Sequence, residues 1–442
     1  MRDHRKTTDD ETEDDLRASW ATLSSEEQVE AFRSLDREDA QDFFVGLATR
    51  DQAELLLSLP LRERRLWIRV LPPDDVTDIL LEIPAVDRNG CLALLDETTR
   101  HEVNALLAYA EDEAGGLMSP WFARVRPEAT VDEAISYLKR QARFHVETIY
   151  YAYVLDAEQR LLGVVSLRQL ITTPGDARVV DVMKTDVVTV REDEDQEAVA
   201  KLLVDHGFVA IPVVDAEGRM KGIVSADDIV DVVEEEATED IQKIGGMEAL
   251  DAPYMSAPFG RMIRKRAGWL TALFLGEMLT ATAMGHYEGE IARAVILALF
   301  VPLIISSGGN SGSQATTLVI RAMALGEVRV RDWWRVIRRE LAAGLTLGMI
   351  LGTIGFVRVV LWQQFFGTYG EHATLVALTV GLSLVGVVTW GTMTGSVLPF
   401  VLRWLGFDPA SASAPFVATL VDVSGLVIYF SVAGVILRRK LL

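Results

Sequence analysis

The hydrophobic pattern is dominated by five long apolar segments in the second half of the chain. They cover about 267–286, 292–325, 339–364, 373–405 and 415–437. Each is long enough to cross a bilayer core of roughly 30 Å as a helix that rises roughly 1.5 Å per residue. The pattern therefore predicts a transmembrane domain of five helices over 265–442.

Basic residues give the expected orientation of these helices. Lys and Arg precede the first segment in RMIRKR and lie between the second and third, whereas the loops HYEGE and QQFFGTYGEH carry neither. Because basic loops stay in the cytoplasm, residues 1–260 are expected there and the C-terminus outside. Arg438, Arg439 and Lys440 oppose this last assignment. We expect a multi-pass protein of the cell (inner or plasma) membrane.

The first 115 residues show a different pattern. Residues 1–18 are acidic and poor in apolar residues, which predicts a disordered tail. Over 19–115, short amphipathic stretches are separated by proline, as in LLLSLPLRERR, and predict a small α-helical domain. Within it Asp74 and Asp78 are four residues apart and share a helix face, either as solvated surface or as metal ligands.

An internal repeat follows the helical domain. Residues 118–171 match 183–230, with Met118 aligned to Met183 and Gly163 to Gly222. Each copy predicts a short strand, a helix, two strands and a helix. The repeat resembles a tandem pair of α/β CBS domains, at 116–175 and 176–236. The resemblance implies a cleft that can bind adenine nucleotides, and the alternative is a purely structural dimerisation module.

An acidic run, DDIVDVVEEEATEDIQK, ends the second copy. Helical spacing places Asp228, Asp231, Glu235 and Glu239 near one stripe. An acidic helix face of this kind is commonly just exposed to solvent. The repulsion among its carboxylates would weaken, however, if a divalent cation bridged this face to a neighbouring element. A connecting plug helix over 237–264 is expected to lead to the membrane.

Charge is divided unevenly and limits the classes of partner. The chain has a net charge of −21, with −28 over residues 1–260 and +7 over 261–442. So acidic a surface argues against nucleic acid and favours hydrated divalent cations. The single Cys91 excludes an intramolecular disulfide and a thiolate metal cluster. The six histidines lack metal-ligand spacing, and GxSxG and P-loop patterns are absent, so no enzyme is expected.

Two apolar segments contain unusual polar groups. Asp422 is ionisable within 415–437 and is expected to face a wet cavity, a cation or a partner, or to be a buried carboxylate hydrogen-bonded between helices. In FVPLIISSGGNSGSQATT, Pro302 and the glycines predict an interrupted helix, beside which Asn310 offers an amide to a hydrated ion. Close helix packing is the alternative role of these glycines.

Four motifs carry a wider resemblance. EDEAGGLM at 111–118, EEEATEDIQK at 234–243, GGNSGSQ at 308–314 and DPASASAPFVATLVDVSGL at 408–426, with the tandem repeat, resemble the MgtE family of magnesium channels along essentially the whole chain. The resemblance implies a homodimer whose pore is lined by the second and fifth spans of both subunits. The expected pore and selectivity residues are Asp422, Ala418, Asp408, Asn310 and Gly425.

The resemblance also implies that cytosolic Mg²⁺ bridges the soluble domains and the plug helix and thereby closes the pore. The metal ligands expected beside Asp408 and Asp422 are Asp42, Asp74, Asp78, Asp195, Glu197, Asp228, Asp231, Glu236, Glu239 and Asp240. ATP is a further expected regulatory ligand. The chain departs from the family pattern at Gly207, which precedes Phe208, and at Ala414 and Ser313 near the pore.

The expected function is a Mg²⁺-selective channel that mediates magnesium uptake. Two alternatives stay open from the sequence. One is a cation-coupled secondary transporter of divalent metals with the same sensor, and the other is a membrane-anchored nucleotide sensor without transport.

Overall fold

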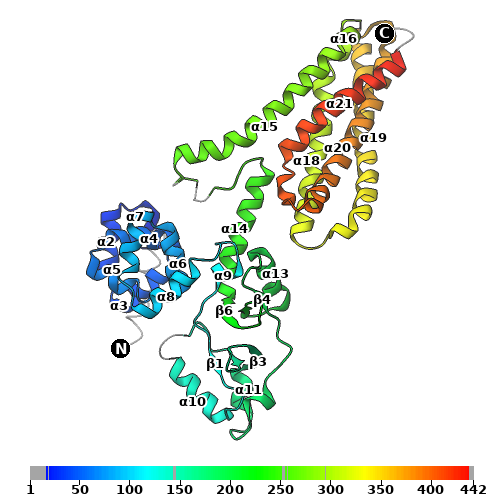
Figure 1. Ribbon diagram of the computed structural model, residues 1–442. Helices are drawn as coiled ribbons and strands as arrows, with labels where there is room; N and C mark the ends of the chain where they lie inside the picture. The colour runs from blue at the N-terminus through cyan, green and yellow to red at the C-terminus, as the bar shows by residue number, and fades with distance from the viewer. Residues whose placement is uncertain are drawn as a thin grey trace, which may run out of the picture. The chain divides into compact units, whose positions relative to one another are not determined.

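The computed structural model describes residues 16–17, 19–142, 146–250, 254–255, 257–293 and 295–437. The described residues divide into two compact units, one up to Glu234 and one from Glu235 onward (Figure 1). The predicted disordered tail, apart from residues 16 and 17, and the basic C-terminal residues lie outside the described part.

The first unit begins with the predicted small helical domain. A short 3₁₀ turn, η1 (Trp20–Thr22), precedes its helices, which are α2 (Ser25–Ser34), α3 (Arg37–Val45), α4 (Thr49–Ser58), α5 (Leu61–Trp67), α6 (Pro73–Glu82), α7 (Ala85–Leu92) and α8 (Glu97–Leu106). Polar caps begin several of them, and Ser24 forms a capping box with Glu27. The core contains Phe32, Phe43 and Trp67. Burial of these aromatic side chains stabilises helices that are too short to fold alone.

The predicted repeat is confirmed in the rest of this unit, and its last helix continues beyond Glu234. After α9 (Ala114–Leu117), the first copy contains β1 (Arg124–Val125), α10 (Val131–Gln141), β2 (Tyr151–Leu155), β3 (Leu161–Ser166) and α11 (Leu167–Thr172). After α12 (Val179–Val182), the second contains β4 (Val190–Arg191), α13 (Gln196–His206), β5 (Ala210–Val214), β6 (Met220–Ser225) and α14 (Ala226–Ile244). Each sheet has a parallel pair followed by an antiparallel pair.

The two copies exchange the segments that precede them. Ser119 pairs with Ile223 of the second sheet, and Lys184 pairs with Val164 of the first. A Cβ atom on Gly222 would lie 2.7 Å from the backbone oxygen of Ser119, too close for any other residue. In each copy, the methionine and the glycine take part in the same contact with the other copy. The exchange therefore explains why both residues recur at matching places.

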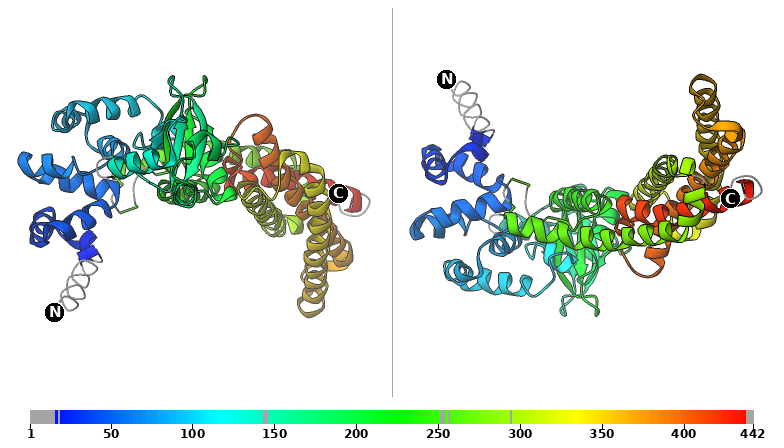
Figure 2. Two further views of the ribbon diagram at one scale, coloured as in Figure 1. Left: turned by 90° about the horizontal axis from the view of Figure 1, so that it is seen from below. Right: turned by 90° about the horizontal axis from the view of Figure 1, so that it is seen from above.

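After α14, the helices of the second unit are α15 (Phe259–His286), α16 (Glu288–Arg293), α17 (Val295–Ala298), α18 (Val301–Ala324), α19 (Trp333–Phe366), α20 (Ala373–Trp404) and α21 (Ala414–Leu437), with 3₁₀ turns η2 (Val330–Asp332), η3 (Gly370–His372) and η4 (Pro409–Ser411). The described residues contain five helices long and apolar enough to span a membrane, which confirms the predicted number. Helices α18 to α21 pack into one bundle (Figure 1), which Figure 2 shows from two further directions.

The prediction of an interrupted second span is wrong. Helix α18 runs unbroken from Val301 to Ala324, because Pro302 stands in its first turn, where a missing N–H costs nothing. A Cβ atom on Gly312 would lie 2.9 Å from the backbone oxygen of Gly391 in α20. The glycines therefore allow α18 and α20 to pack closely, which was the alternative role.

The sequence assigns a plug helix to 237–264, but the observed helix α14 begins earlier in the chain than that range. It is the last helix of the second copy, begins at Ala226 and ends at Ile244, and α15 starts only at Phe259. One uninterrupted helix of 19 residues thus carries the whole acidic run.

Candidate cation sites

Carboxylates from three segments gather in the first unit. Asp74 and Asp75 lie on α6, Glu147 precedes β2, and Asp228 lies in the first turn of α14. Ser119 is fully buried, and its Oγ lies 3.1 Å from Oδ1 of Asp74 and 3.2 Å from Oε2 of Glu147. A hydroxyl has one proton, so it can donate to only one of these carboxylates at a time.

Local backbone contacts hold these groups in place. The N–H of Glu147 donates to the carbonyl of Trp121, and Ser119 is paired to β6 in both directions. The Oγ and N–H of Ser225 both donate to Oδ2 of Asp228, at 2.6 and 3.1 Å, which forms one half of a capping box at the start of α14. A sheet edge therefore positions Ser119 and the backbone of Glu147, and a helix start positions Asp228.

Burial and mutual repulsion disfavour the charged forms of this group. Burial raises the pKa of Asp74 well above its ordinary range, and neighbouring carboxylates add to the shift. The same causes, burial first, raise the pKa of Asp75 to about 6 and that of Glu147 to about 7. Asp78 reaches solvent, yet the protein around its carboxyl and the charge of Asp75 raise its pKa to about 7. Burial raises the pKa of Asp228 to about 6 despite its bonds from Ser225.

These carboxylates lie near one another, but they are not arranged around a common point that could hold an ion. Within the described parts of the chain, no three His, Cys, Asp or Glu side chains are arranged to hold a metal ion. Bound Mg²⁺ usually keeps several waters and takes only one or two carboxylates, so such a site does not require three direct ligands. The predicted set of metal ligands therefore stays a prediction.

Sequence reasoning missed Asp75 and Glu147. Asp75 adjoins Asp74, but the four-residue spacing of a helix face identifies the pair Asp74 and Asp78 and does not include Asp75. Glu147 lies in an irregular segment, where no periodicity marks it. Only its hydrogen bond with Ser119 reveals it.

Other predicted ligands of the first unit lie elsewhere. Asp42 is exposed on α3, and Asp195 and Glu197 are exposed at the start of α13. Asp195 accepts a hydrogen bond from the N–H of Glu197 at 2.9 Å and so caps that helix. Gly207 ends α13 with a φ of +64°, a left-handed conformation that favours glycine. This departure from the family pattern thus has a backbone cause.

The second unit brings together predicted residues from α14 and the loop before α21. The Nζ of Lys243 lies 2.6 Å from Oδ2 of Asp408 and also contacts the carboxylate of Glu239. Partial burial lowers the pKa of Lys243, but its bonds with Asp408 and Glu239 outweigh this effect and raise the pKa above its ordinary range. Glu236 and Asp240 lie on the same helix, half-buried.

Asp422 lies half-buried on α21 and interacts with the carboxyl of Glu277 on α15. A Cβ atom on Gly309 of α18 would lie 3.7 Å from Oδ1 of Asp422 and 3.4 Å from the Cβ atom of Ala418. The glycine therefore keeps the space beside Asp422 open to α18. Asp422 and Ala418 thus lie beside the same glycine of α18.

Other predicted pore residues occupy different surroundings. Asn310 is exposed, and its Nδ2 lies 3.5 Å from Oγ of Ser306. Gly425 is buried, and a Cβ atom there would lie 3.0 Å from Cγ1 of Val387, which gives it a packing role. The two departures near the predicted pore contact each other, because Oγ of Ser313 donates to the carbonyl of Ala414 at 3.1 Å.

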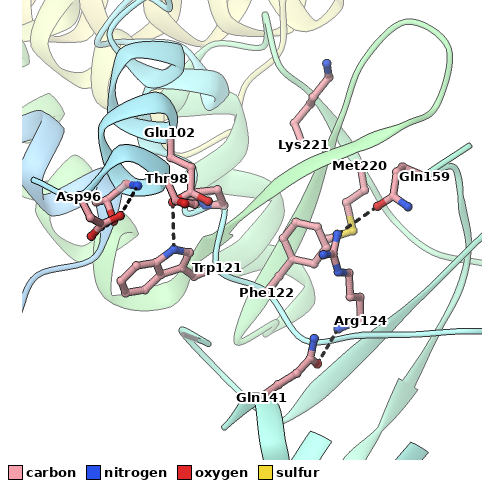
Figure 3. A pocket seen from close by; sticks show the side chains of 12 residues that line it. Asp96, Thr98, Glu102, Trp121, Phe122, Arg124, Gln141, Gln159, Met220 and Lys221 are labelled. Atoms are coloured by element: carbon pink, nitrogen blue, oxygen red, sulfur yellow. Dashed lines mark hydrogen bonds between the residues drawn. The ribbon is translucent and has the colours of Figure 1, made fainter. Parts of the chain in front are cut away.

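A polar cavity of about 600 Å³ lies between α8 and both repeats (Figure 3). Arg124, Gln159 and Lys221 line the repeat side, while Asp96 and Glu102 line the helical side. The indole N–H of Trp121 donates to Glu102 at 3.3 Å, and Arg124 donates to Oε1 of Gln159 at 3.2 Å. The mixed charge of this lining suits a polar ligand.

Three family models match successive parts of the chain. Residues 12–112 match the MgtE intracellular N domain, 114–174 and 179–235 match CBS domains, and 301–432 match MgtE, described as a divalent cation transporter. The chain is 42% identical to the magnesium transporter MgtE of Thermus thermophilus over 96% of its own length and 93% of the relative. The chain belongs to the MgtE family.

Two further relatives have the same name. The magnesium transporter MgtE of Enterococcus faecalis is 36% identical over 76% of this chain and 72% of its own length. That of Bacillus subtilis is 29% identical over 98% and 94%. Family membership and the five candidate spans confirm a multidomain membrane protein, and a transporter family agrees with the expectation that the chain is not an enzyme.

Among solved structures, the crystal structure of the cytosolic domain of the Mg²⁺ channel MgtE in complex with ATP is 44% identical to this chain. It covers 50% of this chain and 90% of its own, with a TM-score of 0.46. The soluble part of a magnesium transporter is 31% identical and covers 52% and 96%, with a TM-score of 0.41.

The raised pKa values predict how this member of the MgtE family responds to pH without divalent cations. A carboxyl whose pKa is raised on folding binds more protons in the folded state, so the free energy of unfolding falls as pH rises from about 4 to about 7. We expect Glu147→Gln to flatten this fall and to stabilise the protein at pH 8, by at most about 3 kcal/mol.

Thermal unfolding of the full chain in detergent and chelator, at pH 5.5 and pH 8, measures this effect. Glu197→Gln is the matched control, because it removes one exposed carboxylate outside the group. Equal loss of stability between the two pH values in Glu147→Gln and the native chain would contradict the prediction.

Proposed function

We propose that this chain is a Mg²⁺-selective channel that mediates magnesium uptake across the cell membrane and is closed by cytosolic Mg²⁺. The observation that carries the proposal is the half-buried Asp422, which faces Glu277 and the space beside Gly309. The relatives of the chain are magnesium transporters. An intramembrane carboxylate is costly in lipid and is therefore typical of an ion path.

The pore needs a partner subunit. The proposed conduction path lies between two copies of the chain, so that Asp422 is contributed twice. Hydrated Mg²⁺ gives up its water reluctantly, and a ring of carboxylates and carbonyls that contacts the hydration shell selects it without full dehydration. Ala418, one turn before Asp422, keeps the path wide enough for such an ion.

The acidic first unit is the proposed sensor. Asp74 and Glu147 both lie within hydrogen-bond distance of Oγ of Ser119, and Ser225 fixes Asp228 at the start of α14, so the fold keeps these carboxylates close together. Bound Mg²⁺ would remove the repulsion and favour the compact arrangement, whereas loss of Mg²⁺ would loosen it. Because α14 continues into the second unit, a change at Asp228 can reach Glu239 along one helix.

The proposed regulatory ligand of the CBS pair is ATP, and the first unit is proposed to lie in the cytoplasm. The tandem repeat supports this proposal, because CBS pairs offer a cleft between copies, and residues 114–174 and 179–235 match that domain. Binding of a fluorescent ATP analogue to the full chain tests it, and absence of saturable binding would contradict it.

The pore proposal predicts that Asp422→Asn lowers Mg²⁺ flux into liposomes by about tenfold or more. Loss of the carboxylate pair would raise the permeation barrier by about 1.4 kcal/mol for each factor of ten. Glu327→Gln, which removes an exposed carboxylate between α18 and α19, should conduct normally. If Asp422→Asn conducts like the native chain, the pore assignment fails and a nucleotide sensor without transport is favoured.

The same liposomes separate the channel from a coupled transporter. Flux through a channel follows the Mg²⁺ gradient and the membrane potential alone. A requirement for an imposed Na⁺ or H⁺ gradient would instead favour the cation-coupled secondary transporter.

The sensor proposal predicts that Asp74→Asn with Asp78→Asn raises the cytosolic Mg²⁺ concentration required to stop flux, by roughly tenfold. The amides keep the shape but remove the charges that attract the cation. Glu26→Gln on α2 is exposed and should leave the concentration unchanged. An unchanged concentration in the double variant would exclude α6 from the sensor.

A further inference from the structure

The end of α14 places a lysine ammonium between two carboxylates of the second unit. Nζ of Lys243 lies 2.6 Å from Oδ2 of Asp408 and contacts Glu239, one turn earlier in its own helix. The side chains of Lys243, Glu239 and Asp408 are 27%, 32% and 37% exposed. Since they are partly shielded from water, the ion pairs are stronger than ordinary surface pairs.

Packing fixes this arrangement. Ile244, next to Lys243, packs against Ala410, Ala412 and Ile320. Oδ1 of Asp408 accepts the N–H of Ala410 at 2.8 Å, which fixes the carboxylate at the start of η4. The ammonium is therefore held at a defined place just before α21.

The chain continues this packing beyond α14. Gly246 has a φ of +76°, and a Cβ atom there would lie 3.1 Å from Cγ of Pro415, in the first turn of α21. The N–H of Leu250 donates to Oε1 of Gln242 at 2.7 Å. The backbone on both sides of Lys243 is thus anchored, and its flexible side chain is the part that can move.

We propose that the Lys243 ammonium is a built-in competitor of divalent cations, which occupies the Glu239–Asp408 carboxylate pair until a divalent cation displaces it. The inference rests on the proposed function and on the expectation from the sequence that both carboxylates are Mg²⁺ ligands. One ammonium leaves the pair with a net charge of −1, whereas a divalent cation added beside it would give +1. The two cations repel each other at this distance, so they alternate.

The competition has two consequences. Lys243 lowers the affinity of the pair for divalent cations, so that a higher cytosolic concentration is needed to fill it. In the absence of divalent cations, the lysine keeps the end of α14 attached to η4. A lysine with a merely structural role would stabilise the protein equally with and without divalent cations.

The test is Mn²⁺ binding to the full chain in detergent, measured by electron paramagnetic resonance of free Mn²⁺. We expect Lys243→Gln to strengthen binding at one site by roughly tenfold and Asp408→Asn to lose that site. Lys265→Gln is the matched control, because Lys265 is a nearby lysine whose Nζ donates to the carbonyl of Ala249. It should bind Mn²⁺ like the native chain.

A second variant and a second measurement guard against misfolding. Lys243→Arg keeps the charge and should bind Mn²⁺ no more tightly than the native chain. Without divalent cations, Lys243→Gln should melt at a lower temperature than the native chain, and millimolar Mn²⁺ should remove the difference. A deficit of the same size with Mn²⁺ would overturn the inference in favour of a structural lysine.

The remaining outcomes separate this inference from the function on which it rests. Unchanged or weaker Mn²⁺ binding in Lys243→Gln, with a site lost in Asp408→Asn, overturns the competition alone. Native binding in Asp408→Asn overturns both the competition and the assignment of Asp408 as a cation ligand, while Asp422→Asn still tests the pore.

Discussion

Repulsion between carboxylates that the fold holds close together is the constraint on which the first unit of this protein depends. Asp74, Glu147 and Asp228 come from a helix, a loop and a helix start, and Ser119 at a sheet edge contacts two of them. Such a group would be unfavourable in a domain that had only to fold. The group becomes useful when binding of a cation from the surrounding solution neutralises its charges.

Helix α14 joins the acidic group to the membrane unit. It carries Asp228 in its first turn and Glu239 and Lys243 in its last turns, over a length of roughly 28 Å at the usual rise per residue. A rigid helix is suited to transmit a change at one end to the other, because its backbone hydrogen bonds leave few soft torsions. The charged pair with Asp408 then lies directly before the helix that carries Asp422.

Close packing between helices makes the membrane unit rigid. Close contacts at Gly308 and Gly312 bring α18 against α20, and Thr316 donates to the carbonyl of Gly395 at 2.9 Å. Lipid gives no hydrophobic driving force for such packing, so short contacts and interhelical hydrogen bonds replace it. A tightly packed α18–α20 pair leaves the region beside Asp422 as the place where ion passage is proposed.

The sequence by itself determined the features that depend on local pattern. Five apolar segments, two matching copies of a strand–helix–strand–strand–helix unit and an acidic first half follow from composition and periodicity, which do not require knowledge of the fold. The α18 glycines show the limit of that reasoning. Glycine predicts either a break or a close contact, and only the position of α20 decided for the contact.

Only the tertiary structure decided which polar side chains meet. Glu147 lies 28 residues from Ser119, and Lys243 lies 165 residues from Asp408, yet each pair is in hydrogen-bond contact. No periodicity connects residues so far apart, because their distance depends on how strands pair and helices pack between them. The pKa of a carboxyl likewise follows from its burial and its neighbours, which a sequence pattern does not contain.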